Sequence, residues 1–267
     1  MLEFALSGLR SGLRGRSFHA VFFLGVLTIG IAYLSGFFSP RQPQTVALDV
    51  GFSGIRFSLV LLNLFWVQEL VAREIDRRVI LFSLAYPVSR AAFLAGRFAA
   101  VLLLSLLAAT VLGLLLLLAV MMAGGSYSQE FSLALGVPFW TAIAGLTLDA
   151  AVVAAFALCI AALSTVSVLP LALGAAFAVA GKALGATIDY LARGADGDEE
   201  LLASYSPLVD RIRWLVPDLS RLDWREWSMY QLAPGAEMVF WSVTMAIGYI
   251  GLLVVTASLL FSRREFS

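Results

Sequence analysis

Long apolar runs alternate with shorter polar segments along this chain of 267 residues. A helix needs about 20 apolar residues to cross a hydrocarbon core of roughly 30 Å. Runs of that length lie at about 18–38, 52–71, 91–123, 136–163, 167–188 and 237–261. The first run follows a basic segment but lacks the small-residue cleavage pattern of a signal peptide. The pattern therefore predicts an all-α polytopic membrane protein with six transmembrane helices.

Residues 1–17, ahead of the first run, are amphipathic. Leucines recur at helical spacing on one narrow face, at Leu2, Leu6, Leu9 and Leu13. The charged residues beside this face are Glu3, Arg10 and Arg14. Such a pattern predicts an interfacial helix in the headgroup region. It either transmits movement to the first span or only orients the chain.

The segments between the spans differ in length. The fourth and fifth spans are separated only by the polar residues 164–167, with Pro170 following, so a tight hairpin is expected. Residues 189–236 form a long outer segment that opens with an acidic run at 193–200. Its tryptophans among charged residues are Trp214, Trp224 and Trp227. We expect helices at the outer leaflet interface there, forming either a small cap or a substrate-binding lid.

Arginine placement predicts the orientation of the spans. One side carries Arg10, Arg14, Arg16, Arg73, Arg77, Arg78, Arg90, Arg97, Arg263 and Arg264. The other side has Arg41 in a short loop, no basic residue in 124–135, and five arginines among nine acids in the long outer segment. We therefore expect the arginine-rich side and both termini to be cytoplasmic.

Composition narrows the function classes. Charged residues make up 13% of the chain, against roughly 25% in soluble proteins, and 61% are hydrophobic. The net charge of +0 does not favour nucleic acid as a partner. A single cysteine, Cys159, and a single histidine, His19, argue against a disulfide framework, a metal site and a Ser–His intramembrane protease. The sequence also has no Gly-x-x-x-x-Gly-Lys-Ser/Thr phosphate loop, so it is not expected to bind ATP in that way.

Three charged residues lie within the apolar runs. Asp149 is about 13 residues into the fourth run, near mid-membrane at 1.5 Å per residue, where a lone carboxylate costs on the order of 3 kcal/mol. It either faces a translocation path, pairs with another helix, or is protonated and hydrogen-bonded to a neighbour. Arg56 and Lys182 lie near the outer ends of their spans. They either share such a path or pair, or snorkel to the headgroups.

Small residues in the fifth span repeat at helical spacing. They are Gly174, Ala178, Gly181 and Gly185. Such a seam lets another helix approach closely, so we expect a packing surface within or between subunits.

A charged segment, residues 69–97, separates the second apolar run from the third. The apolar residues on one helical face of its middle part are Ile75, Val79, Phe82 and Tyr86. Pro87 ends this helix because the residue before proline avoids the helical region, and Ser89 can cap the next one. We expect an amphipathic cytoplasmic helix at about 73–87.

The order of these features resembles the cytoplasmic segment of ABC-2 type permeases, the membrane subunits of ABC exporters. The matching residues are Arg73-Glu74, Leu84, Pro87-Val88-Ser89-Arg90 and Gly96-Arg97. Arg78-Val79 stands where a Gly-Thr pair is common in that family. The likeness covers nearly the whole chain. Residues 216–224 resemble the permeases grouped with multicopper-enzyme maturation, which include the nitrous-oxide-reductase accessory permease.

The resemblance implies a homodimeric permease subunit that exports substrate across the bacterial inner membrane. A separate cytoplasmic ABC ATPase subunit would bind ATP and Mg, and this chain would have no ATPase site. The residues implied to couple to that ATPase are Arg73, Glu74, Asp76, Arg77, Arg78, Phe82, Pro87, Ser89 and Arg90. Membrane lipid and an extracytoplasmic accessory protein are further expected partners. The alternatives are a membrane anchor that recruits an extracytoplasmic partner, and a proton-coupled transporter that uses Asp149.

Overall fold

The computed structural model describes residues 2–39, 41–76, 90–123, 132–164, 166–192 and 217–263. Within these ranges every regular element is helical and no strand is present. Six helices are long and apolar enough to cross a membrane, which confirms the predicted fold class. They are α2 (Arg16–Phe37), α3 (Pro43–Val67) with an extension to Ala72, α6 (Arg90–Ala123), α7 (Val137–Leu163), α8 (Leu169–Ala192) and α11 (Ala236–Arg263).

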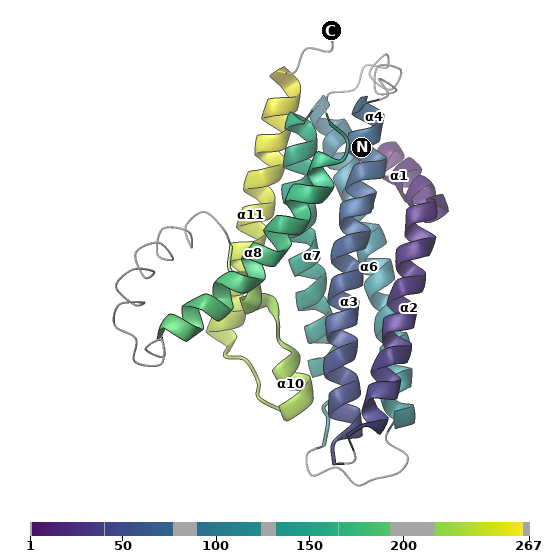
Figure 1. Ribbon diagram of the computed structural model, residues 1–267. Helices are drawn as coiled ribbons and strands as arrows, with labels where there is room; N and C mark the ends of the chain where they lie inside the picture. The colour runs from purple at the N-terminus through teal and green to yellow at the C-terminus, as the bar shows by residue number, and fades with distance from the viewer. Residues whose placement is uncertain are drawn as a thin grey trace.

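The long helices form a bundle in which successive helices run in alternate directions (Figure 1). One end of the bundle holds α1 (Leu2–Arg14), the end of α3, the α7–α8 turn and the end of α11, and we call it the terminal end. The opposite end, which we call the loop end, holds the α2–α3 turn and residues 217–235. Both described chain ends therefore lie on the same side of this multi-pass membrane protein.

The second crossing is longer than the predicted run at 52–71. α3 begins at Pro43, because proline lacks an N–H and suits the first turn of a helix. At its other end α3 continues through a π-helical turn, η1 (Gln68–Ala72), into the short helix α4 (Arg73–Asp76). The sequence does not mark this irregular turn. η1 contains neither proline nor glycine, the usual sequence markers of an irregular helix.

Aromatic side chains fill the centre of the bundle, where α3 and α7 are the most enclosed of the six crossings. The rings of Phe52 on α3 and Phe139 on α7 are both fully buried, with centroids 5.5 Å apart. At the terminal end Phe93 on α6 stacks against Phe261 on α11 at 6.4 Å. These contacts hold in place the helices that carry the charged residues described below.

The N-terminal helix α1 packs on protein as well as facing outward. Gly8 and Gly12 are buried, and a side chain at either position would overlap Ala100 or Leu104 of α6. The two glycines therefore let α1 lie directly on α6. Of the predicted leucine face, Leu9 and Leu13 pack against the core and Leu6 is 48% exposed, while the two glycines make the closest approach.

The α7–α8 connection is the tight hairpin that the sequence predicts, since α7 ends at Leu163 and α8 begins at Leu169. Ser164 closes the turn, because its Oγ donates to the carbonyl of Val166 at 2.8 Å and accepts from the Val166 N–H at 2.9 Å.

The described part of the long outer segment folds back onto the bundle. It contains a 3₁₀ turn, η3 (Leu219–Leu222), and α10 (Arg225–Tyr230), which contact α7, with η3 also on α8 and α10 on α3. Trp224 is 7% exposed and lies beside Gly145 of α7. The indole ring therefore packs on α7, where the missing side chain of Gly145 leaves room for it and for the Leu222 carbonyl, and the position of this segment at the leaflet interface stays a prediction. Trp214 lies outside the described residues.

Candidate functional site

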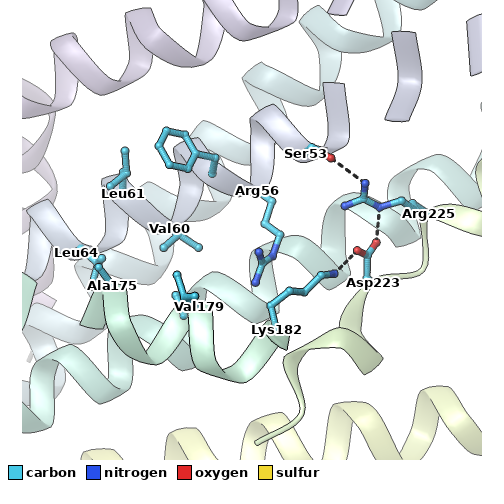
Figure 2. Close-up of a pocket in the computed structure, with 12 residues that line it drawn as sticks. Ser53, Arg56, Val60, Leu61, Leu64, Ala175, Val179, Lys182, Asp223 and Arg225 are labelled. Carbon is cyan, nitrogen blue, oxygen red and sulfur yellow. Dashed lines mark hydrogen bonds and ion pairs between the residues drawn. The ribbon is translucent and has the colours of Figure 1, made fainter. Parts of the chain in front are cut away.

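A cavity of about 540 Å³ lies between α3 and α8, beneath the folded-back segment. Figure 2 shows that its lining is divided into a charged end and an apolar end. The polar lining residues are Ser53, Arg56, Lys182, Asp223 and Arg225. The apolar lining residues are Phe57, Val60, Leu61, Leu64, Ala175, Ala178 and Val179. The cavity is thus amphipathic, with its charges toward the loop end.

An ion pair between α3 and α7 lies at the charged end. Arg56 Nε donates to Asp149 Oδ2 at 2.5 Å, and the two side chains are 19% and 2% exposed. Arginine stays protonated in proteins, so Arg56 supplies the counter-charge that a buried carboxylate requires. The ion pair therefore joins α3 to α7.

The two residues of the ion pair lie at similar distances from the terminal end. Asp149 lies roughly 21 Å from Leu163, and Arg56 roughly 24 Å from Ala72, at 1.5 Å per residue. Measured from these residues, the pair is about three-quarters of the way across a core of roughly 30 Å. Measured along α7, which is longer than such a core, Asp149 lies close to the helix midpoint, so its mid-membrane position stays a prediction.

A second group of charges links the folded-back segment to α8 and α3. Lys182 Nζ on α8 donates to Asp223 Oδ2, and Arg225 Nε donates to Asp223 Oδ1 at 2.7 Å. Arg225 Nη1 also donates to Asp49 Oδ1 at 2.7 Å and to Ser53 Oγ at 2.9 Å on α3. Asp223 therefore holds two cations from different elements, and the segment is fastened to both walls of the cavity.

The electrostatics of this group support its ionised form. Burial alone would raise the pKa of Asp223, but the hydrogen bond and charge of Arg225, with the Lys182 ammonium, hold it below its ordinary value. Burial would likewise lower the pKa of Arg225, yet Asp223 and Asp49 raise it above its ordinary value. Both groups stay charged at neutral pH, and opening the cavity at this end must separate them.

Two buried polar atoms in the charged end have no hydrogen-bond partner among the described residues. They are Nη2 of Arg56 and Oδ1 of Asp149. A buried donor without an acceptor costs about 1–3 kcal/mol, and a guanidinium normally uses several of its five donors. The Arg56–Asp149 pair is therefore incompletely satisfied by protein groups.

Of the alternatives for Arg56 and Lys182, these contacts support pairing within the protein rather than snorkelling to headgroups. Each cation turns instead to an acid on another element, because an ion pair inside the fold replaces the solvation that the headgroups would offer. Sequence reasoning missed Asp49, Asp223 and Arg225 as site residues. The available signal is the run of mixed charges at 218–226, which suits ion pairing within the protein as well as the leaflet interface.

The small residues of α8 pack against other elements of the same chain. Gly181 and Gly185 lie against η3, where a side chain would overlap Leu219 or Ser220. Gly174 lies against Leu64 of α3, and Ala178 lines the cavity. The seam thus brings α8 close to α3 at one end while leaving room for η3 at the other.

A separate cluster lies at the terminal end, around the buried Arg97 of α6. Arg97 Nη2 donates to Glu74 Oε1 of α4 at 2.6 Å, and its Nη1 donates to Ser7 Oγ of α1 at 3.3 Å. The guanidinium also lies 5.5 Å from the ring centroid of Phe93. One side chain therefore joins α1, α4 and α6.

The π-helical turn contributes to the same cluster. Glu69 of η1 accepts a hydrogen bond from Ser17 Oγ at 2.6 Å and one from Arg73 Nη1 at 3.5 Å. Trp66, one turn earlier, donates from Nε1 to the Gly12 carbonyl at 3.4 Å. Burial raises the pKa of Glu74, although the neighbouring Arg97 guanidinium acts in the opposite direction. π-Helical turns are frequent at functional sites, and this one joins Ser17 of α2 and Arg73 of α4 through Glu69.

The structure describes part of the predicted coupling segment. Arg73 and Glu74 belong to the terminal-end cluster, and Asp76 ends α4. Arg90 begins α6 and donates to the carbonyls of Phe261 and Ser262, both at 3.3 Å. The remaining predicted residues lie outside the described residues: Arg77, Arg78, Phe82, Pro87 and Ser89.

Comparison with protein-family models finds no match, and comparison with curated proteins finds none either. Among the described residues, no group of three or more His, Cys, Asp or Glu side chains could hold a metal ion. The functional assignment therefore depends on the geometry of the two charged clusters.

Proposed function

We propose that this protein is the membrane-spanning subunit of an ABC exporter, acting as a homodimer in a bacterial inner membrane and driven by a separate cytoplasmic ATPase. Residues 77–89 would dock on the ATPase. The terminal end, where the chain carries most of its arginines outside the long outer segment, would face the cytoplasm. The transported substrate would pass between helices of the bundle.

The observation that carries the proposal is the Arg97 cluster. It lies where the chain leaves α4 for residues 77–89, and α6 begins directly after that segment. Arg97 ties both flanks to α1 through Glu74 and Ser7. A push on residues 77–89 would therefore move α1 and α6 together, and Arg90 would pass the movement to α11. This is the mechanical connection that a coupling segment requires.

The test is whether an ATPase activity co-purifies with the chain. The tagged protein is extracted from its native membranes in mild detergent, and Mg-dependent ATP hydrolysis is measured in the fractions where it elutes. We expect hydrolysis from a co-eluting subunit that contains a phosphate loop, identified by mass spectrometry. If no ATPase co-elutes with the wild-type chain, the proposed function is wrong.

Charge reversal tests the docking segment. Arg77→Glu with Arg78→Glu should remove both the co-eluting ATPase and its activity, because two cations would become anions at the contact. The control is Arg41→Glu, which changes an exposed arginine at the loop end and should leave hydrolysis unchanged. Unchanged binding and activity in the double variant would exclude Arg77 and Arg78 as contacts.

A proton-coupled transporter would behave differently. In that case transport would proceed without any ATPase, and Asp149→Asn would abolish it. In the ABC exporter the same substitution should act through the Arg56 contact, and ATP would still be required for transport.

A further inference from the structure

The cavity between α3 and α8 has the dimensions of one lipid leaflet. Along α3 its lining extends from Ser53 to Leu64, which is about 16 Å at 1.5 Å per residue. A hydrocarbon core is roughly 30 Å thick, so the cavity runs from the Arg56 level toward the bilayer centre. Its volume of about 540 Å³ lies within the usual range for small-molecule sites.

The cavity also adjoins the lipid-facing surface. Phe57 and Val179, which line it from α3 and α8, are 55% and 69% exposed. Exposed large apolar side chains on crossing helices face acyl chains in a bilayer. A molecule already dissolved in the membrane therefore reaches the cavity sideways, between α3 and α8.

The charged end presents more cation than anion to the cavity. Lys182 is 34% exposed and Asp223 only 14%, and Arg56 is 19% exposed while Asp149 is 2%. Asp149 lies behind Arg56, whereas Asp223 lines the cavity together with Lys182 and Arg225. Figure 2 shows the side chain of Arg56 reaching from α3 toward α8, where the side chain of Lys182 extends to Asp223. An anion bound by both Arg56 and Lys182 would reduce the repulsion between these like charges.

An oxygen atom of such an anion would also accept a hydrogen bond from the guanidinium of Arg56, which lines the cavity, is 19% exposed and uses its Nε for Asp149. Guanidinium groups bind phosphate through paired hydrogen bonds. The geometry therefore calls for an anionic head at Arg56 and Lys182, joined to an apolar tail that follows Val60, Leu64 and Val179 toward mid-membrane.

We propose that this cavity binds one anionic phospholipid from the leaflet at the loop end. Its phosphate lies between Arg56 and Lys182, and one acyl chain fills the apolar part. The inference does not depend on an ATPase, because the site belongs to a single chain and lipid binding can be measured without nucleotide. Its failure would leave the proposed exporter function untouched.

Native mass spectrometry of the full-length chain tests the proposal with phosphatidylglycerol and phosphatidylcholine of the same acyl chains. We expect one bound phosphatidylglycerol, with an affinity about tenfold higher than for phosphatidylcholine, as expected for one charge-assisted contact. Lys182→Gln should reduce phosphatidylglycerol binding by about tenfold for the same reason. Glycerol phosphate alone should not compete, because it lacks the acyl chain.

Two matched substitutions on α8 distinguish blocking of the cavity from general destabilisation of the fold. Ala175→Phe places a ring in the apolar part without changing any charge, and it should reduce phosphatidylglycerol binding. Ala176→Phe adds the same ring at an exposed position and should not. The proposal is overturned if both variants bind as wild type, if the two lipids bind equally well, or if Ala175→Phe disrupts a dimer while lipid binding is unchanged. The last result would assign the cavity to a second copy of the chain.

Discussion

Replacing Arg56 alone should destabilise the bundle more than replacing Asp149 alone, and replacing both should cost less than replacing Arg56. Removing one partner of a buried ion pair typically costs about 3–5 kcal/mol, because the other charge remains without compensation. Arg56→Gln leaves a carboxylate that is 2% exposed, so we expect about 4 kcal/mol. Asp149→Asn leaves a guanidinium that is 19% exposed and partly solvated, so we expect about 2–3 kcal/mol.

The double variant Arg56→Gln with Asp149→Asn removes both charges and should cost about 1–2 kcal/mol, because neutral isosteres need no counter-charge. The two effects are therefore strongly non-additive, with a coupling of several kcal/mol. Since 1 kcal/mol shifts the unfolding midpoint of a chain of this size by about 2–4 °C, Arg56→Gln should lower it by roughly 8–16 °C.

Thermal unfolding in detergent, followed by the fraction of protein that still elutes as a folded species, measures all four proteins of this cycle. Single variants whose effects add to the effect of the double variant within about 0.5 kcal/mol would show that the two residues are energetically independent. That result would refute the ion pair as a support of the fold. Equal losses for the two single variants would refute the argument from their unequal burial.

Two other predictions concern the folded-back segment. The lowered pKa of Asp223 means that its carboxylate stabilises the fold above the ordinary value of 3.8, and this stabilisation is lost as the pH falls through the folded-state value below it. Tryptophan fluorescence should show the segment detaching in acid, with Trp224→Phe reducing the signal and Asp223→Asn removing the transition. Gly145→Ala should cost about 1–3 kcal/mol in thermal unfolding, because the added methyl overlaps the Leu222 carbonyl. The control Gly248→Ala, where the structure has open space, should stay near wild type, and equal midpoints for both would contradict the packing of this segment.

The crossings could be predicted because each is a local property of the sequence. Apolar length alone locates a helix in a membrane, so α6 and α7 begin and end within one residue of their predicted bounds. The start of α3 was missed because residues 43–51 are less apolar, and their burial against the bundle depends on neighbouring helices. The hairpin at Ser164 was visible because turn-forming residues act on their own backbone.

The charged site could not be predicted to the same degree, because its contacts join distant parts of the chain. Arg56 and Asp149 are separated by 93 positions, and Lys182 and Asp223 by 41. Considered helix by helix, a cation near a span end is equally suited to a headgroup or to an unseen acid. Measuring each charge from the terminal end of its helix would have placed Arg56 and Asp149 at the same depth, which is the signal that the sequence does contain.

The π-helical turn η1 sets the rotational phase of α4. A regular α-helix turns about 100° per residue, and a π-helical turn accommodates one residue more than an α-helical turn. If the same residues of Gln68–Ala72 wound as a regular α-helix, the extra residue would rotate α4 by about 100° relative to the bundle. Arg73 and Glu74 would then point away from α1 and Arg97, although every side chain of the cluster would still be present. The wider turn is therefore what keeps α4 in phase with the crossings.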